Sequence, residues 1–157
     1  MRAIMVFFAV FAGMFQSPVH TIEQDVLKSY LEKGAPFDFI LIDVCGGDEI
    51  SAAIGNAGCK PYNLEWPTPF KEISGKIPKD RAIIVYCQSG GRAARAASYL
   101  SESGYSHVYN AGGFLTWKGP TVPPSEIKPA ALLPEPSCKS RQWPAEWQTG
   151  TLPFSPV

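Results

Sequence analysis

The chain has 157 residues, of which 45% are hydrophobic, and its formal net charge is zero. This length accommodates one ordinary α/β domain with additional terminal segments, and the apolar content indicates a packed core rather than a wholly disordered chain. A neutral chain produces no long-range field that attracts nucleic acid, so we expect no nucleic-acid partner.

The first residues have the pattern of a targeting segment. Arg2 precedes an apolar run from Ala3 to Phe15, which is shorter than the about 20 residues that a membrane-spanning helix needs. An early basic residue followed by such a run is typical of a secretory signal peptide. We therefore expect residues 1–20 to be a signal peptide, membrane contact to occur only through this segment, and the protein to be periplasmic or secreted. A buried N-terminal strand or helix is the alternative.

The next stretch predicts an amphipathic helix followed by a buried strand. Thr21 with Gln24 three residues later predicts a capping box, and Gly34 is placed to end the helix. One face of this helix is apolar: Ile22, Val26, Leu27, Tyr30 and Leu31. The continuous apolar run "FILIDVC" that follows predicts a strand buried on both sides.

Strands and helical segments then alternate. Further strands are predicted at Tyr62–Leu64, at "AIIVYC" and at His107–Tyr109. Helical segments are predicted in "GDEISAAIG", in "PTPFKEISGKIPKDR", from Gly90 and Gly91 to about Ser103, and in "GGFLTWKG". This alternation predicts an α/β domain over residues 21–119, with a parallel sheet of about five short strands and helices on both faces.

The composition changes after Gly119. Nine of the 15 prolines lie between residue 119 and the end of the chain. Proline at this density prevents helices and central strands, so residues 120–157 are predicted to form a Pro-rich extended tail. Because the tail also contains Trp143, Trp147 and Phe154, we expect part of it to lie back on the domain or to contact a partner protein.

The four cysteines do not form a metal-binding pattern. None belongs to a CxxC pair and the chain has only two histidines, so no metal site is expected. If Cys87 stays reactive, the three remaining cysteines allow at most one disulfide. Our hypothesis pairs Cys59 with Cys138, and Cys45 remains an alternative partner.

Cys87 has the most informative surroundings. It is predicted to lie at the carboxyl end of a strand, where parallel sheets bind their ligands. Two glycines let the following N–H groups turn toward one point at the start of the next helix. These amides, the helix terminus and an arginine favour a thiolate and an oxyanion beside it. The candidate binding loop is Gln88, Ser89, Gly90, Gly91 and Arg92. An inert core cysteine is the alternative.

The length of this loop distinguishes two reaction classes. Cysteine phosphatases place an arginine at the sixth position after the cysteine, whereas here Ala93 takes the sixth position and Arg92 the fifth. The smaller loop fits a sulfur group better than a phosphate ester, so the spacing favours sulfur chemistry. Arg95, one helical turn further on, is interpreted equally as a surface residue or as a second anion contact.

With these residues, the segment "IIVYCQSGGRAARAASYLSESGYSHVYNAGGFLTW" resembles the rhodanese family of sulfurtransferases, as do "FILIDVC" and "YNLEW". The arrangement is most similar to single-domain exported members. The resemblance implies a rhodanese-like three-layer domain and an enzyme that moves sulfane sulfur from a donor such as thiosulfate to cyanide or a thiol through a persulfide on Cys87. It further implies that residues 88–92 hold the persulfide, that Arg92 binds the sulfonate of the donor, and that no cofactor is needed.

The chain departs from the family pattern at three places. Cys45 replaces an arginine, "AIGNAGCKP" replaces a Gly-His-Ile-Pro-Gly stretch, and Ala93 replaces a common serine or threonine. These changes concern the preferred donor more than the chemistry. Because Cys45 ends a strand at the same edge, it is a candidate to resolve the persulfide or to form a disulfide with Cys87. Asp43 and Glu49 match acidic positions to which we assign structural roles.

Two functions therefore remain open. The first is the thiosulfate-type sulfurtransferase, with a small-molecule donor and acceptor as its partners. The alternative is a non-catalytic binding module or a redox-sensing thiol protein, which would act through the tail or through Cys45 and Cys87.

Overall fold

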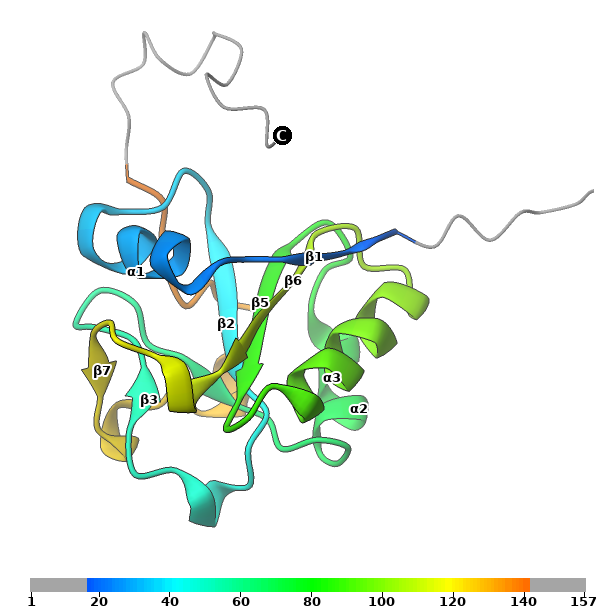
Figure 1. The fold of residues 1–157 in the computed structure, drawn as a ribbon. Helices are drawn as coiled ribbons and strands as arrows, with labels where there is room; N and C mark the ends of the chain where they lie inside the picture. Colours follow the sequence, from blue (N-terminus) through cyan, green and yellow to red (C-terminus); the bar gives the residue numbers. More distant parts are fainter. Residues whose placement is uncertain (1–16, 142–157) are drawn as a thin grey trace, which may run out of the picture.

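The computed structural model describes residues 17–141 and confirms the predicted α/β class (Figure 1). A five-stranded sheet in the order β1-β6-β5-β2-β4 has parallel neighbours throughout. Its strands are β1 (Val19–Thr21), β2 (Phe39–Asp43), β4 (Tyr62–Asn63), β5 (Ala82–Cys87) and β6 (Val108–Gly113). A separate antiparallel pair joins β3 (Ala53–Ile54) and β7 (Thr121–Val122).

Helices cover both faces of the five-stranded sheet. The α-helices are α1 (Gln24–Lys33), α2 (Phe70–Ile73) and α3 (Gly91–Glu102). Alternate residues of the central strands point to opposite faces: Ile42 and Val85 join the core with α2 and α3, whereas Leu41 and Ile84 join the core with α1. The continuous apolar run of β2 follows from this three-layer arrangement, because both of its faces are buried.

The start of α1 differs from the prediction. Thr21 ends β1, which pairs with β6, and the helix has Glu23 at its N-cap without a side-chain hydrogen bond. The capping box is therefore wrong, and Gln24 is left for another contact. Gly34 does end the helix, and its N–H donates to the Tyr30 carbonyl. Val26, expected on the buried face, is 42% exposed.

Two predicted helical segments and one strand also differ from the prediction. The segment predicted to be helical after β2 forms one 3₁₀ turn (Gly47–Glu49) and then strand β3, and the last predicted short helix is a 3₁₀ turn (Phe114–Thr116). Strand β6 continues four residues past Tyr109, so the Asn-Ala-Gly-Gly sequence is part of it. No helix within residues 17–141 has the length and apolar character needed to cross a membrane.

Residues 120–141 run back along the domain. β7 pairs with β3, and near the amino end of β2 the Phe39 N–H donates to the Cys138 carbonyl. The Ser137 hydroxyl accepts a hydrogen bond from the Leu41 N–H at 2.9 Å. Cys138 forms a disulfide with Cys59, which confirms the predicted pairing. Trp143, Trp147 and Phe154 lie outside the described residues, as does the predicted signal peptide up to residue 16; its last two residues, Val19 and His20, belong to β1.

Candidate active site

Cys87 ends β5 with its sulfur turned into the loop that follows. Its Sγ accepts hydrogen bonds from the backbone N–H groups of Gly90, at 3.0 Å, and Ala93, at 3.4 Å. The residue has no exposed surface. The sulfur is thus buried, but the groups aimed at it are amide donors, which suit a sulfur that carries negative charge.

The loop needs glycine at the position where the backbone turns. Gly90, the N-cap of α3, has φ +99°, in the left-handed region that other residues rarely adopt. This conformation is followed immediately by the first turn of α3, whose N-terminal amides have no partner within the helix. The local sequence therefore directs both Gly90 N–H and Ala93 N–H toward Sγ.

The end of β6 supports the loop from behind. A side chain at Gly113 would place its Cβ 2.8 Å from the Gln88 carbonyl oxygen, so only glycine fits this contact. The Leu115 N–H donates to the same Gln88 oxygen at 3.1 Å. The loop that holds the sulfur is consequently packed directly on the Asn-Ala-Gly-Gly segment.

Gln24 fixes that segment from the start of α1. Its Nε2 donates to the carbonyl oxygens of Ala111, at 3.2 Å, and Gly113, at 2.8 Å, and its Oε1 accepts from the Thr116 hydroxyl. One amide thus donates to two carbonyl groups of β6, and the Gly113 oxygen also accepts from the Thr116 hydroxyl at 3.1 Å. Gln24 is therefore connected to the sulfur loop through Gly113.

Arg92 forms an ion pair at the rim of the site. Its guanidinium donates to the Glu49 carboxylate at 2.6 Å, and Glu49 also accepts from the Gly46 N–H. The hydrogen bond with Arg92 lowers the pKa of Glu49, and the same bond raises the pKa of Arg92. Glu49 thus stays ionised at neutral pH and occupies part of the only guanidinium in the loop.

Cys45 lies at the neighbouring strand end in a different environment. The Asp43 carboxylate, only 2% exposed, accepts a hydrogen bond from the Cys45 N–H at 2.9 Å. Burial raises the pKa of Asp43. Burial, followed by the hydrogen bond and the negative charge of Asp43, raises the pKa of Cys45 to about 12. The Asn63 amide holds the turn by donating to the Cys45 carbonyl. Cys45 is therefore a protonated thiol at neutral pH.

Comparison with known proteins identifies the family. The family model described as Rhodanese-like domain matches residues 23–120. The chain belongs to the rhodanese-like domain family. A curated protein named Sulfurtransferase from Allochromatium vinosum is 37% identical over 82 residues, which cover 51% of this chain and 72% of that protein.

Further relatives agree with this assignment. Thiosulfate sulfurtransferase PspE from Escherichia coli is 42% identical over 50 residues, and this match covers 29% of the chain and 48% of the relative. The solution structure of the Rhodanese-like domain from the Anabaena Alr3790 protein is 26% identical with a TM-score of 0.55, covering 69% of this chain and 83% of that one. Several curated relatives are thus named sulfurtransferases, but the chain spans about half the length of some of them.

The rhodanese-like domain brings the predicted loop together as follows. Gly90 donates to the sulfur, Gly91 begins α3, and Arg92 reaches the rim. The Gln88 carbonyl is used in packing and Ser89 is exposed. Two contributions were missed by the sequence analysis: the Ala93 N–H, because a backbone donor has no side-chain signature, and Gln24. No signal in the sequence pointed to Gln24, because the capping pattern with Thr21 accounted for its amide.

Proposed function

We propose that this rhodanese-like domain is a sulfurtransferase that carries sulfane sulfur from a donor such as thiosulfate to a thiophilic acceptor, through a persulfide on Cys87. The supporting observation is the sulfur of Cys87 held between the N–H groups of Gly90 and Ala93. Amides directed at one sulfur stabilise a thiolate, which is the nucleophilic form. The same donors suit the terminal sulfur of a persulfide anion.

The first half-reaction loads the enzyme. The Cys87 thiolate attacks the outer sulfur of thiosulfate, a new S–S bond forms on Sγ, and the old S–S bond breaks with its electron pair leaving on sulfite. Charge is conserved, because a thiolate and a dianion give a persulfide anion and a dianion. No oxidant is required. In the second half-reaction, a nucleophile such as cyanide attacks the terminal sulfur and the electron pair of the Cys87–sulfur bond returns to Sγ.

Arg92 is the residue that we assign to the sulfonate of the donor. A guanidinium has five N–H donors in a planar fork, which suits three oxygens around one sulfur. In the free protein, this guanidinium is already paired with Glu49, whose Oε2 lies 2.6 Å from Arg92 Nη2. Because Cys87 has no exposed surface, a donor has to displace neighbouring side chains to reach the sulfur. Exchange of Glu49 for the sulfonate at Arg92 is one such step.

The test is direct detection of the loaded sulfur. Purified wild-type protein incubated with thiosulfate and then desalted is expected to gain the mass of one sulfur atom, and the gain is expected to disappear when cyanide is added, with thiocyanate formed. Cys87→Ser should show neither change, whereas the matched variant Cys45→Ser should behave as wild type. Equal thiocyanate formation by Cys87→Ser and wild type would eliminate this function.

We also propose that the chain is exported. The basic and apolar residues before Phe15 and the Cys59–Cys138 disulfide support this, since stable disulfides are typical of oxidising compartments. Because Val19 begins β1, processing that preserves the sheet has to occur before residue 19. The intact mass of the protein recovered from the extracytoplasmic fraction should fit such a start. An unprocessed chain confined to the cytoplasm would contradict export.

A further inference from the structure

An open surface groove runs along α3, the helix that follows the sulfur loop. Its volume is about 400 Å³, within the range of small-molecule sites. One wall is formed by α3, from Ala94 to Glu102, and the other by Trp66, which lies between β4 and α2, and by Lys71 of α2. The eight helical steps from Ala94 to Glu102 give the groove a length of roughly 12 Å along α3.

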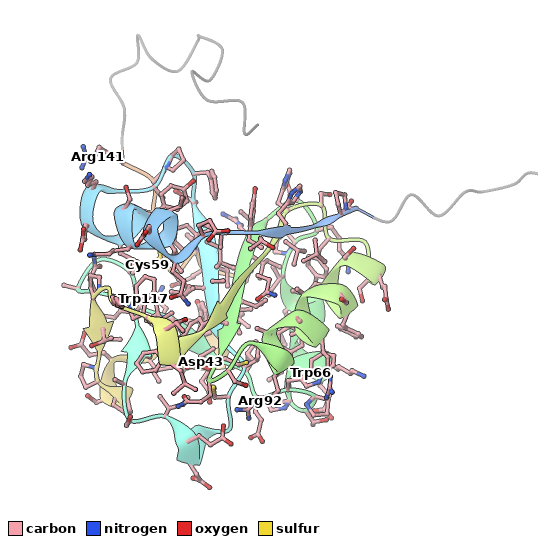
Figure 2. The ribbon with its side chains drawn as sticks, viewed as in Figure 1. Asp43, Cys59, Trp66, Arg92, Trp117 and Arg141 are labelled. Atoms are coloured by element: carbon pink, nitrogen blue, oxygen red, sulfur yellow. A yellow bond between two sulfur atoms is a disulfide. The ribbon has the colours of Figure 1, made fainter. Side chains whose placement is uncertain are left out.

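One end of the groove begins one residue after a backbone donor to the sulfur. Ala93 donates its N–H to Sγ, and the next residue, Ala94, lines the groove. On the opposite wall, the Trp66 N–H donates to the Val44 carbonyl, and Val44 is itself hydrogen-bonded to the end of β5. Both walls are thus anchored at the carboxyl edge of the sheet. Figure 2 shows Trp66 and Arg92 on the same side of the molecule, near the start of α3.

The walls combine aromatic rings with cations. The rings of Trp66 and Tyr99 meet edge to face, with centroids 5.8 Å apart. The Lys71 ammonium lies 5.0 Å from the Trp66 centroid and 5.3 Å from the Tyr99 centroid. Such cations over aromatic faces remain open to an anion on their solvent side.

The cations of the groove are not neutralised by ion pairs. Within residues 17–141, neither Lys71 nor Arg95 forms a salt bridge, in contrast to Arg92. The acid of the groove, Glu102, is seven residues beyond Arg95 on α3. A carboxylate is therefore favoured beside Lys71 and Arg95, and the rest of the acceptor extends from there toward Ala94 and the loop.

We propose that this groove binds the sulfur acceptor, and that the acceptor is a low-molecular-weight thiol carrying a carboxylate. This inference rests on the proposed persulfide chemistry and specifies its second half-reaction. With its carboxylate between Lys71 and Arg95, the acceptor presents its thiolate to the loop. The thiolate attacks the terminal sulfur, a new S–S bond forms on the acceptor, and the Cys87–sulfur bond breaks with its electron pair returning to Sγ. The products are a small-molecule persulfide anion and the Cys87 thiolate.

The experiment separates acceptor charge from intrinsic reactivity. Protein loaded with thiosulfate is desalted and unloaded with 3-mercaptopropionate, 2-mercaptoethanol or cysteamine, which carry a negative, neutral and positive group, and with cyanide. Rates are compared at equal thiolate concentration. For wild type we expect 3-mercaptopropionate to be preferred over 2-mercaptoethanol, with cysteamine slowest. Lys71→Gln/Arg95→Gln should lower the rate for 3-mercaptopropionate roughly 2- to 10-fold, as expected for exposed ion pairs, and leave loading and cyanide unloading unchanged.

Two controls make the outcome specific. Lys76→Gln removes an exposed lysine outside the groove and should retain the preference for 3-mercaptopropionate. Lys71→Arg keeps the positive charge in the groove and should retain most of this preference. A double variant that loads normally and unloads into 3-mercaptopropionate as fast as wild type would overturn the groove assignment.

Binding of 3-(methylthio)propionate, an unreactive carboxylate analogue, separates this inference from the proposed function. Calorimetric binding that is lost in the double variant supports the groove even if wild type fails to load, a result that would reject the sulfurtransferase proposal alone. Absence of binding by wild type, together with no charge preference in unloading, would reject the groove.

Discussion

Two neighbouring strands, β2 and β5, end near a buried cysteine at the same edge of the sheet, but the surroundings of the two sulfurs differ. Cys87 follows a strand that opens into a glycine loop, and its sulfur receives two backbone N–H groups. Cys45 follows a strand that ends in a buried carboxylate, and its pKa is raised to about 12. Burial is common to both, so the neighbouring dipoles and charges, and not exposure, distinguish the candidate nucleophile from the inert thiol.

The same comparison weighs against a resolving role for Cys45. A thiol attacks a persulfide or a sulfenic acid as its thiolate, and burial, together with the carboxylate of Asp43, opposes formation of that thiolate. Both thiols are free in the structure. The arginine-to-cysteine departure at residue 45 therefore places a neutral group beside the site.

The largest expected effect is a difference in alkylation of the two thiols. With a pKa of about 12, Cys45 has a thiolate fraction on the order of 10⁻⁴ at pH near 8. We expect iodoacetamide to label Cys87 at least roughly 100-fold faster than Cys45 in the native protein, as measured by peptide mass spectrometry over time. In urea the two rates should converge. Faster native labelling of Cys45 would reverse the assignment of the nucleophile.

The next effect concerns the ion pair at the rim. Arg92→Gln removes the guanidinium proposed to hold the sulfonate, and we expect the KM for thiosulfate to rise roughly 10- to 100-fold, the value of a charge-assisted hydrogen bond. Steady-state kinetics with saturating cyanide measures this change. The rate of Cys87 alkylation should change much less, because Arg92 donates no hydrogen bond to Sγ in the structure.

Glu49→Gln is the matched control for Arg92. It removes the carboxylate that lies 2.6 Å from the Arg92 guanidinium and that would compete with the donor for it. The KM for thiosulfate should therefore fall instead of rise. Because the hydrogen bond with Arg92 lowers the pKa of Glu49, this carboxylate is ionised at neutral pH and the difference between the variant and wild type should persist there. A KM that rises in both variants would show that the Arg92–Glu49 ion pair only stabilises the conformation of the site.

A smaller effect is expected at Gln24. Gln24→Ala leaves the Ala111 carbonyl without its amide donor and the Gly113 carbonyl with only the Thr116 hydroxyl, which loosens the segment of β6 that supports the loop. We expect persulfide loading to slow roughly 5- to 30-fold, corresponding to about 1–2 kcal/mol for unsatisfied partners, with a smaller change in KM than in kcat. Asp25→Asn, the next residue of the same helix, should load as wild type. A lower melting temperature with normal loading would limit Gln24 to a structural role.

The sequence was informative where local chemistry determines the structure. The apolar strand, the two glycines and the helix after Cys87 interact over a few residues, so the order of strand, glycine turn and helix was predicted correctly. Excluding Cys87 left three possible pairings, and the hypothesis of Cys59 with Cys138, which the sequence did not decide, matches the structure.

Contacts that depend on distant pairing were not predictable in the same way. Thr21 and Gln24 satisfied a capping pattern, but pairing of β1 with β6 placed Thr21 in a strand and directed Gln24 to Gly113, 89 residues away. The Ala93 N–H was missed because any residue except proline supplies that donor. The Arg92–Glu49 pair joins residues 43 apart, and neither spacing nor periodicity links them.

The smallest expected effect tests why the Cys45 thiol is unreactive. Asp43→Asn, made in a Cys87→Ser background, removes the negative charge beside Cys45 but keeps an oxygen that can accept the Cys45 N–H. Because the charge of Asp43 contributes to the raised pKa, the thiolate fraction of Cys45 at a given pH should increase, and alkylation should accelerate roughly 2- to 5-fold. The gain is limited because burial, the larger cause, remains. The pH profile of alkylation should therefore move toward lower pH while staying above that of an exposed cysteine. An unchanged profile would assign the inertness of Cys45 to burial alone, and the contrast with Cys87 would then depend on the amide donors of the loop.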